Sequence, residues 1–263
     1  MIEIFAIIGS ALAGAWDLKT TEVPDEVPYI MTFIGIVYWF FIAIITGNFY
    51  TLFISLTVGS VILVAGLILY HTGKWGGADA WILAAIAYMV PMMNGKIFMI
   101  DYMMNFLIVS IVYMVIYSIS LGIKNRVFSV YLTELRKRIL SVTLIPIAYG
   151  IIAFIPIILI PGAIRMLPSF LFSFLLIICL VLFWVYTKVI EKHVFTKKIS
   201  VSKLREGDVL AADIWVGLTA SQVKDIQKKK KFVTIKEGIR FVPVFAITLV
   251  TTLLWGNLFF VVL

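Results

Sequence analysis

The sequence predicts an all-α polytopic membrane protein with about eight transmembrane helices (six to eight) and a small cytoplasmic α+β appendage. Three observations lead to this prediction. The chain of 263 residues is 62% hydrophobic with a mean hydropathy of +1.09, which is more apolar than a soluble domain can hide in its core. Apolar stretches divide the chain, and most approach the roughly 20 residues that a spanning helix requires. The positive charges, finally, lie almost entirely in alternate connections between these stretches, as in membrane proteins.

Eight apolar stretches are the expected spans. Their limits are about 2–16, 27–46, 49–71, 80–94, 103–123, 141–163, 168–187 and 241–263. The first and fourth are short, so we expect those helices to end below the lipid headgroups or to lean on their neighbours. The pair at 141–163 and 168–187 is rich in proline, and it either spans twice or forms a re-entrant hairpin.

The distribution of basic residues predicts the orientation. If the N-terminus lies outside and the chain crosses at every stretch, all Lys and Arg except Lys96 and Arg165 fall in the cytoplasm, which is 20 of the 22. The positive-inside rule selects this orientation over its reverse. No basic residue precedes the first apolar stretch, so we expect an uncleaved helix rather than a signal peptide. The predicted location is the cell membrane, with multiple passes.

The predicted organisation has five parts. They are a catalytic membrane domain at 1–123, a basic cytoplasmic loop at 124–140, two further membrane segments at 141–187, a soluble cytoplasmic appendage at 188–240 and a C-terminal transmembrane helix at 241–263. Within the appendage, the pattern indicates two short strands around a Glu-Gly-Asp turn. A short helix then opens at Thr219 or Ser221 and ends in lysines, as its dipole favours.

Two aspartates stand at the ends of apolar stretches. Asp17 closes the first stretch, and Asp79 opens the fourth. A carboxylate beside hydrocarbon is costly and marks a candidate functional site. The chain crosses the bilayer twice between them, so both acids reach the same, cytoplasmic face. Two carboxylates at close range repel, so that one keeps a proton, and such a dyad can hydrolyse a peptide bond with either aspartate holding the proton.

The residues beside Asp79 admit two interpretations. Gly76 and Gly77 lack Cβ atoms, so an extended peptide can approach the carboxylate closely. The alternative is that Asp79 caps the helix that begins there. For Asp17, the alternative is an interfacial residue that is solvated or paired with Lys19.

These two motifs resemble those of the GXGD-type aspartyl membrane proteases, in particular the prepilin peptidases and their archaeal preflagellin-peptidase branch. The matching segments are Trp16-Asp17-Leu18-Lys19-Thr20-Thr21-Glu22-Val23-Pro24-Asp25 and Gly76-Gly77-Ala78-Asp79. Ala78 departs from the second glycine of G-x-G-D and is similar to the archaeal form. Segments 204–214 and 235–245 resemble the C-terminal part of longer archaeal members. The resemblance covers 1–123 and, less closely, 198–250.

The resemblance implies a function. Asp17 and Asp79 would activate water against one peptide bond near the cytoplasmic face and release the short basic leader of a pilin-like or archaellin precursor. The implied partners are these precursors and membrane lipids, with no nucleic acid, and the oligomeric state is open. Bacterial relatives often carry paired Cys-x-x-Cys metal motifs and methylate the new N-terminus. Because Cys179 is the only cysteine, we expect no metal, no cofactor and no methyltransferase activity.

Three acidic residues follow Asp17 within ten positions: Glu22, Asp25 and Glu26. They lie on a face that is otherwise rich in Lys and Arg. We hypothesise that they bind the basic leader ahead of the scissile bond. The alternative is an ordinary solvated loop.

Other functions remain possible for this pattern. A proton- or ion-coupled transporter would use Asp17 and Asp79 as ion ligands, but carriers place such residues near the midplane in matching halves. A presenilin-like intramembrane protease also pairs two aspartates, held deeper in the membrane. A non-catalytic scaffold for pilus assembly would tolerate loss of either carboxylate.

Overall fold

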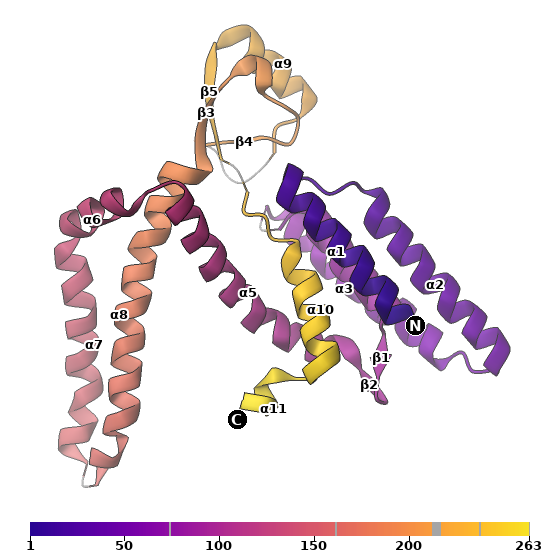
Figure 1. The fold of residues 1–263 in the computed structure, drawn as a ribbon, viewed down its shortest axis with the longest axis horizontal. Coiled ribbons are helices and arrows are strands. Elements are labelled where there is room, and N and C mark those ends of the chain that lie inside the picture. The colour runs from indigo at the N-terminus through magenta and orange to yellow at the C-terminus, as the bar shows by residue number, and fades with distance from the viewer. Residues whose placement is uncertain (74, 161, 212–216, 237, 263) are drawn as a thin grey trace. The chain divides into compact units, whose positions relative to one another are not determined.

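The computed structural model describes all residues except 74, 161, 212–216, 237 and 263. The described chain is mainly helical (Figure 1). It forms two compact units, of which the first comprises Met1–Val115, Val201–Lys231 and Glu237–Leu263 and the second comprises Ile116–Ser200 and Phe232–Lys236.

The first unit contains the N-terminal helices and the C-terminal helices of the chain. Its elements are α1 (Ile2–Thr20), α2 (Glu26–Thr46), α3 (Tyr50–His71), α4 (Gly77–Met89), β1 (Met92–Met93), β2 (Lys96–Ile97), the first part of α5 (Phe98–Lys124), η3 (Val201–Lys203), β4 (Val209–Leu210), α9 (Ala220–Lys229), α10 (Pro243–Trp255) and α11 (Leu258–Val262).

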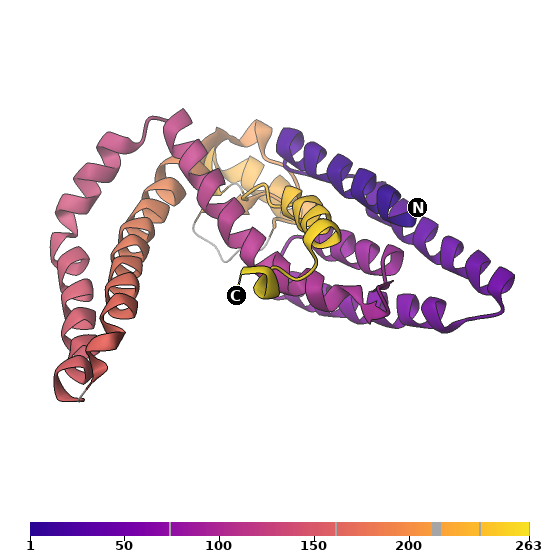
Figure 2. The same cartoon turned by 60° about the horizontal axis from the view of Figure 1, so that its bottom comes forward.

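The second unit is built around a helical pair. Its elements are the end of α5, α6 (Phe128–Lys137), α7 (Ile139–Leu159), η1 (Ala163–Met166), α8 (Leu167–Ile190), η2 (Glu191–Phe195), β3 (Thr196–Ser200) and β5 (Phe232–Lys236). Helices α7 and α8 lie side by side in both views (Figures 1 and 2). Strands β3 and β5 pair antiparallel, with Thr196 opposite Lys236 and Ser200 opposite Phe232.

Five helical segments in the described part of the chain are long and apolar enough to cross a membrane. They are α2, α3, α5, α7 and the segment Ala163–Phe195 that contains α8. The remaining predicted spans fall on shorter or more polar helices: α4 and α10 have 13 residues each, and α1 carries Glu3, Asp17 and Lys19. These segments indicate a multi-pass membrane protein, and the count of eight spans stays a prediction.

Helix α4 is the centre of the first unit. It contacts α1, α2 and α3, and nearly all of its residues after Asp79 are buried. Glycines on the neighbouring helices make this packing possible. A Cβ on Gly59 would lie 2.4 Å from the ring of Tyr88, and one on Gly66 would lie 2.8 Å from the Cβ of Ala80. Small residues at such contacts let helix backbones approach closely.

Side chains from the neighbouring helices also fix the end of α4. The last carbonyls of a helix lack intrahelical partners. Here Trp39 Nε1 donates to the carbonyl of Met89 at 3.0 Å, and Ser55 Oγ donates to that of Tyr88 at 2.7 Å. With 13 residues, α4 is about 20 Å long, shorter than the roughly 30 Å hydrocarbon core.

The chain leaves α4 through a β-hairpin that the sequence analysis did not predict. Pro91 follows the helix, and the strands β1 and β2 pair through Met92–Ile97 and Met93–Lys96. Asn94 and Gly95 form the turn with φ of 52° and 77°, as two-residue hairpin turns require. The predicted stretch 80–94 is therefore a helix followed by the first strand of a hairpin.

The last predicted stretch, 241–263, contains two helices rather than one. Helix α10 ends at Trp255, Gly256 has a φ of 66°, and α11 begins two residues later. Asn105 stabilises this break, because its Nδ2 donates to the carbonyl of Gly256 and its Oδ1 accepts from the N–H of Leu258 at 2.8 Å.

The predicted appendage, 188–240, is shared between the units: 201–231 belongs to the first, while its β3 and β5 belong to the second. As predicted, its helix α9 opens at Thr219. The Thr219 N–H donates to Gln222 Oε1 at 2.9 Å, and Thr219 Oγ1 accepts from the Gln222 N–H, which is a capping box. The predicted Glu-Gly-Asp turn lies at 206–208, where Gly207 has a φ of 89°.

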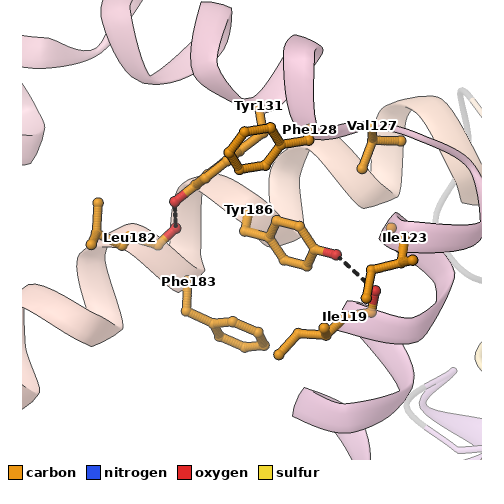
Figure 3. Close-up of a pocket in the computed structure, with 9 residues that line it drawn as sticks. Ile119, Ile123, Val127, Phe128, Tyr131, Leu182, Phe183 and Tyr186 are labelled. Atoms are coloured by element: carbon orange, nitrogen blue, oxygen red, sulfur yellow. Dashed lines mark hydrogen bonds between the residues drawn. The ribbon is translucent and has the colours of Figure 1, made fainter.

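A cavity of about 310 Å³ lies in the second unit between the end of α5, α6 and α8 (Figure 3). Its walls are mainly aliphatic and aromatic side chains, and the two lining tyrosines direct their hydroxyls to main-chain carbonyls. Tyr131 donates to Leu182 at 3.2 Å, and Tyr186 donates to Ser118 at 2.9 Å.

Candidate active site

Asp17 lies near the end of α1, and it is buried, with only 6% of its surface exposed. The helix ends just beyond it at Thr21, which has a left-handed conformation and donates its N–H to the Asp17 carbonyl at 2.9 Å. The side chain makes a longer-range contact. Its Oδ2 accepts the main-chain N–H of Val242 at 3.1 Å, across 225 positions of sequence.

A glycine one turn earlier explains how this contact forms. A Cβ on Gly14 would lie 3.0 Å from the Cα of Pro243, so an added side chain would force α1 and the start of α10 to move apart. Pro243 occupies the first turn of α10, and Val242 is its N-cap residue. The N-terminus of a helix attracts negative charge because its N–H groups and dipole point outward. The carboxylate of Asp17 therefore lies at a favourable helix end.

Arg240 strengthens the same contact. Its guanidinium donates a hydrogen bond to the carbonyl of Leu18, and its positive charge acts on the carboxylate of Asp17. The main chain of Arg240 is itself held, because the hydroxyl of Tyr113 donates to its carbonyl at 2.6 Å. The segment before α10 is thus attached to both α1 and α5.

Asp79 lies in the first turn of α4 and is partly buried. Its Oδ2 accepts the main-chain N–H of Gly76 at 3.1 Å. The capping interpretation is therefore realised in the structure, with Asp79 as the third helical residue rather than as the N-cap. A Cβ on Gly76 would lie 3.0 Å from this same oxygen, so the glycine leaves the carboxylate accessible from that side.

The structure brings the two predicted aspartates within range of a charge–charge interaction. Helices α1 and α4 are in contact, and both carboxyl groups lie outside the five candidate spans. Burial raises the pKa of Asp79 to about 7; the N–H of Gly76 opposes this shift, and the negative charge of Asp17 adds to it. Burial also raises the pKa of Asp17, against the N–H of Val242 and the charge of Arg240. The arrangement favours a pair with one proton near neutral pH.

The other predicted site residues lie in the first turn of α4 or on the connection that follows α1. Gly77 and Ala78 occupy the first turn of α4 and are partly buried. The three acidic residues proposed to bind the leader, Glu22, Asp25 and Glu26, lie at the connection from α1 to α2 and are all exposed.

Sequence reasoning missed Arg240 and Val242. No local pattern points to Val242, because it contributes a main-chain N–H from the far end of the chain. For Arg240, the only signal was its place in the segment 235–245, which resembles the C-terminal part of longer archaeal members.

Among the residues that the structure describes, no three His, Cys, Asp or Glu lie together as possible metal ligands. Two interacting carboxyl groups, of which one carries a proton, can act as acid and base towards water and a carbonyl group.

Comparison with known proteins gives one family match. The family model described as the type IV leader peptidase family matches residues 4–119, which include most of α1, all of α2 to α4, both aspartates and most of α5. Searches of the curated proteins and of the solved structures gave no match. The matched region is less than half of the 263 residues, and it contains neither Arg240 nor Val242. Residues 4–119 are thus similar to the type IV leader peptidase family, a description that implies a protease.

Proposed function

We propose that this protein is a membrane aspartyl endopeptidase that removes the short basic leader from pilin-like or archaellin precursors at the cytoplasmic face of the cell membrane. Asp17 and Asp79 are its catalytic residues. The observation that carries the proposal is their interaction, because α1 and α4 bring together two carboxyl groups, separated by 62 positions in the sequence, inside the region that matches the leader peptidases.

The chemistry of the pair supports hydrolysis. An ionised carboxylate can take a proton from water while a protonated carboxyl group donates one to the peptide carbonyl. Burial raises the pKa of Asp79 to about 7, so both forms are accessible near neutral pH. A pair of ordinary exposed aspartates would be ionised together at this pH and would have no acid to offer.

The surroundings of the pair fit a basic leader. Glu22, Asp25 and Glu26 are exposed on the connection that follows α1, a few residues after Asp17. A leader that is rich in Lys and Arg can bind there through charge attraction, with its scissile bond near Gly76 and Gly77. The proposed orientation, with the N-terminus outside, places this connection in the cytoplasm together with 20 of the 22 basic residues.

The position of the aspartates argues against the transporter alternative. Coupling-ion sites of carriers are typically formed near the bilayer midplane by broken helices in two matching halves. Here the aspartates lie near the end of α1 and at the beginning of α4, and both helices belong to one unit. The leader peptidase match likewise favours cleavage of precursors over presenilin-like cleavage within a span.

A cleavage assay tests the function. The purified full-length protein in detergent is mixed with a precursor that has a Lys- and Arg-rich leader before a hydrophobic helix, and with the same precursor after its basic residues are changed to Gln. Mass spectrometry should find one cut at the end of the leader and slower cleavage of the neutral form. If folded protein cuts none of several precursors, the peptidase proposal fails, and proton uptake into proteoliposomes becomes the next assay.

A further inference from the structure

We propose that Arg240 and the main-chain N–H of Val242 are positioning groups that keep Asp17 ionised, so that Asp17 is the base and Asp79 the acid of the pair. This inference rests on the proposed peptidase function and assigns the proton within it. It also gives a role in that function to a C-terminal segment that lies outside the region matched by the leader peptidase family.

The geometry places the Val242 N–H on the Asp17 carboxylate and the Arg240 guanidinium on the main chain of the next residue. The Val242 N–H donates to Asp17 Oδ2 at 3.1 Å in a buried contact. The Arg240 guanidinium donates to the carbonyl of Leu18, the next residue in the chain. The segment that carries them is fixed on its other side by Tyr113, whose hydroxyl donates to the Arg240 carbonyl at 2.6 Å.

Charge, rather than hydrogen bonding, distinguishes the two aspartates. Each accepts one main-chain N–H at 3.1 Å, Asp17 from Val242 and Asp79 from Gly76. The repulsion between the two carboxylates is mutual, so it favours a single proton on the pair without deciding which carboxyl group keeps it. The cation of Arg240 acts on Asp17. An opposite charge favours the ionised form, so Asp17 is the ionised member and the proton of the pair belongs on Asp79.

The pKa directions agree with this assignment. The N–H of Val242 and the charge of Arg240 both counteract the rise that burial causes in the pKa of Asp17. The charge of Asp17 adds to the effect of burial on Asp79, whose pKa rises to about 7.

The assignment gives a balanced reaction. The Asp17 carboxylate takes one proton from water, and the water oxygen forms a bond to the peptide carbonyl carbon while Asp79 gives its proton to the carbonyl oxygen. The resulting tetrahedral diol then collapses. The C–N bond breaks, the leaving nitrogen takes the proton from Asp17, and a diol hydroxyl returns a proton to Asp79. Both aspartates regain their initial protonation states, and the products are a carboxylic acid and an amine.

The kinetic test compares Arg240→Gln, Arg240→Lys and a control, Arg205→Gln, which removes a positive charge from an exposed position of the same unit. The acid limb of kcat/KM against pH reports ionisation of the pair in the free enzyme. Loss of the Arg240 charge should move this limb to higher pH by about one unit. Arg240→Lys and Arg205→Gln should keep it near the wild-type position. A wild-type limb in folded Arg240→Gln would overturn the proposal.

Infrared spectroscopy locates the proton of the pair without an Arg240 variant, so it also serves if Arg240→Gln does not fold. Infrared difference spectra of the wild type near pH 6 should contain the band of a protonated carboxyl group. This band should disappear in Asp79→Asn and persist in Asp17→Asn. The reverse result would place the proton on Asp17 and overturn the assignment.

Failure of the peptidase function and failure of the Arg240 role give different results. If the wild-type protein cleaves no precursor, the peptidase function is wrong. If the wild type cleaves, Asp17→Asn and Asp79→Asn do not, and Arg240→Gln has a wild-type profile, only the role of Arg240 is wrong.

Discussion

Val242 donates its main-chain N–H to the carboxylate of Asp17 at 3.1 Å, although 225 positions separate the two residues. The contact joins the end of α1 to the start of α10. It brings to Asp17 a group from outside the N-terminal region that matches the leader peptidase family. Substitutions at this contact, at Asp79 and at the acidic connection therefore give separate tests of the site.

Gly14→Val should disturb the contact between α1 and α10. A Cβ at Gly14 already lies 3.0 Å from the Cα of Pro243, which is a backbone atom and cannot rotate away. We expect cleavage to fall about 10²-fold, because a displacement of about 1 Å at a catalytic group costs this much. Ala11→Val places the same side chain at an exposed position of the same helix, and it should leave kcat within about threefold of the wild type. Equal rates for the two variants would show that this close approach is unimportant.

Asp79→Asn should make the protein more stable at alkaline pH. The folded-state pKa of Asp79 is about 7, above the ordinary value of 3.8, so the folded protein binds this proton more tightly than the unfolded chain. The resulting stabilisation is complete below pH 3.8 and is lost as the pH rises through 7. Asparagine is neutral throughout. The Tm of the variant should therefore exceed that of the wild type by several degrees at pH 9. Each kcal/mol of unfolding free energy corresponds to about 2–4 °C in Tm.

The comparison of Tm needs a second pH and a control. Below pH 3.8 the Asp79 carboxyl group is protonated in both the folded and the unfolded chain, so the Tm difference between Asp79→Asn and the wild type should nearly vanish there and should be smaller at pH 5 than at pH 9. Asp225→Asn changes an aspartate that is exposed, and its Tm difference should not depend on pH in this way. A constant difference for Asp79→Asn from pH 5 to pH 9 would contradict the raised pKa.

Glu22→Gln, Asp25→Asn and Glu26→Gln together should raise the KM for a basic leader. All three side chains are exposed on the connection after α1, where charge attraction to Lys and Arg is screened and worth roughly 0.2–1 kcal/mol per pair. The expected increase is about threefold to tenfold, with kcat unchanged and no effect on a neutral leader. Glu206→Gln with Asp225→Asn removes acids from exposed positions elsewhere, and its KM should match the wild type. An unchanged KM in the triple variant would leave the acids as an ordinary solvated loop.

Gly122→Ala should destabilise the second unit. A Cβ there would lie 1.8 Å from the hydroxyl oxygen of Tyr186, which donates to the Ser118 carbonyl. Overpacking of this kind costs about 1–3 kcal/mol. Tyr186→Phe removes the hydroxyl, so the added methyl should cost less in the double variant than in the wild type. Additive effects in a double-mutant cycle of unfolding would show that the glycine is not kept for this tyrosine.

The sequence predicted the long apolar helices well. The expected stretches 27–46 and 49–71 became α2 (Glu26–Thr46) and α3 (Tyr50–His71), because about 20 consecutive apolar residues leave the backbone few alternatives in a membrane. The proximity of Asp17 and Asp79 was also predictable. Counting the crossings between them was enough to place both at one end of the helices.

Contacts that depend on the main chain or on distant packing were not predictable. Val242 contributes an N–H that every residue except proline has, and only the fold brings it to Asp17. The hairpin after α4 did carry a signal in Asn94-Gly95, which is typical of a two-residue turn, but it lay at the end of an apolar stretch that was interpreted as a span. The division of 241–263 into α10 and α11 likewise depends on Gly256 and on its contact with Asn105.

The most direct test of the central claim is the initial rate of leader cleavage by the wild type, Asp17→Asn, Asp79→Asn and the control Asp101→Asn, all purified in the same detergent and checked for folding. We predict cleavage by the wild type and by Asp101→Asn, and none by either of the other two variants. Cleavage that survives in Asp17→Asn or in Asp79→Asn would remove that aspartate from catalysis and contradict the two-carboxylate mechanism.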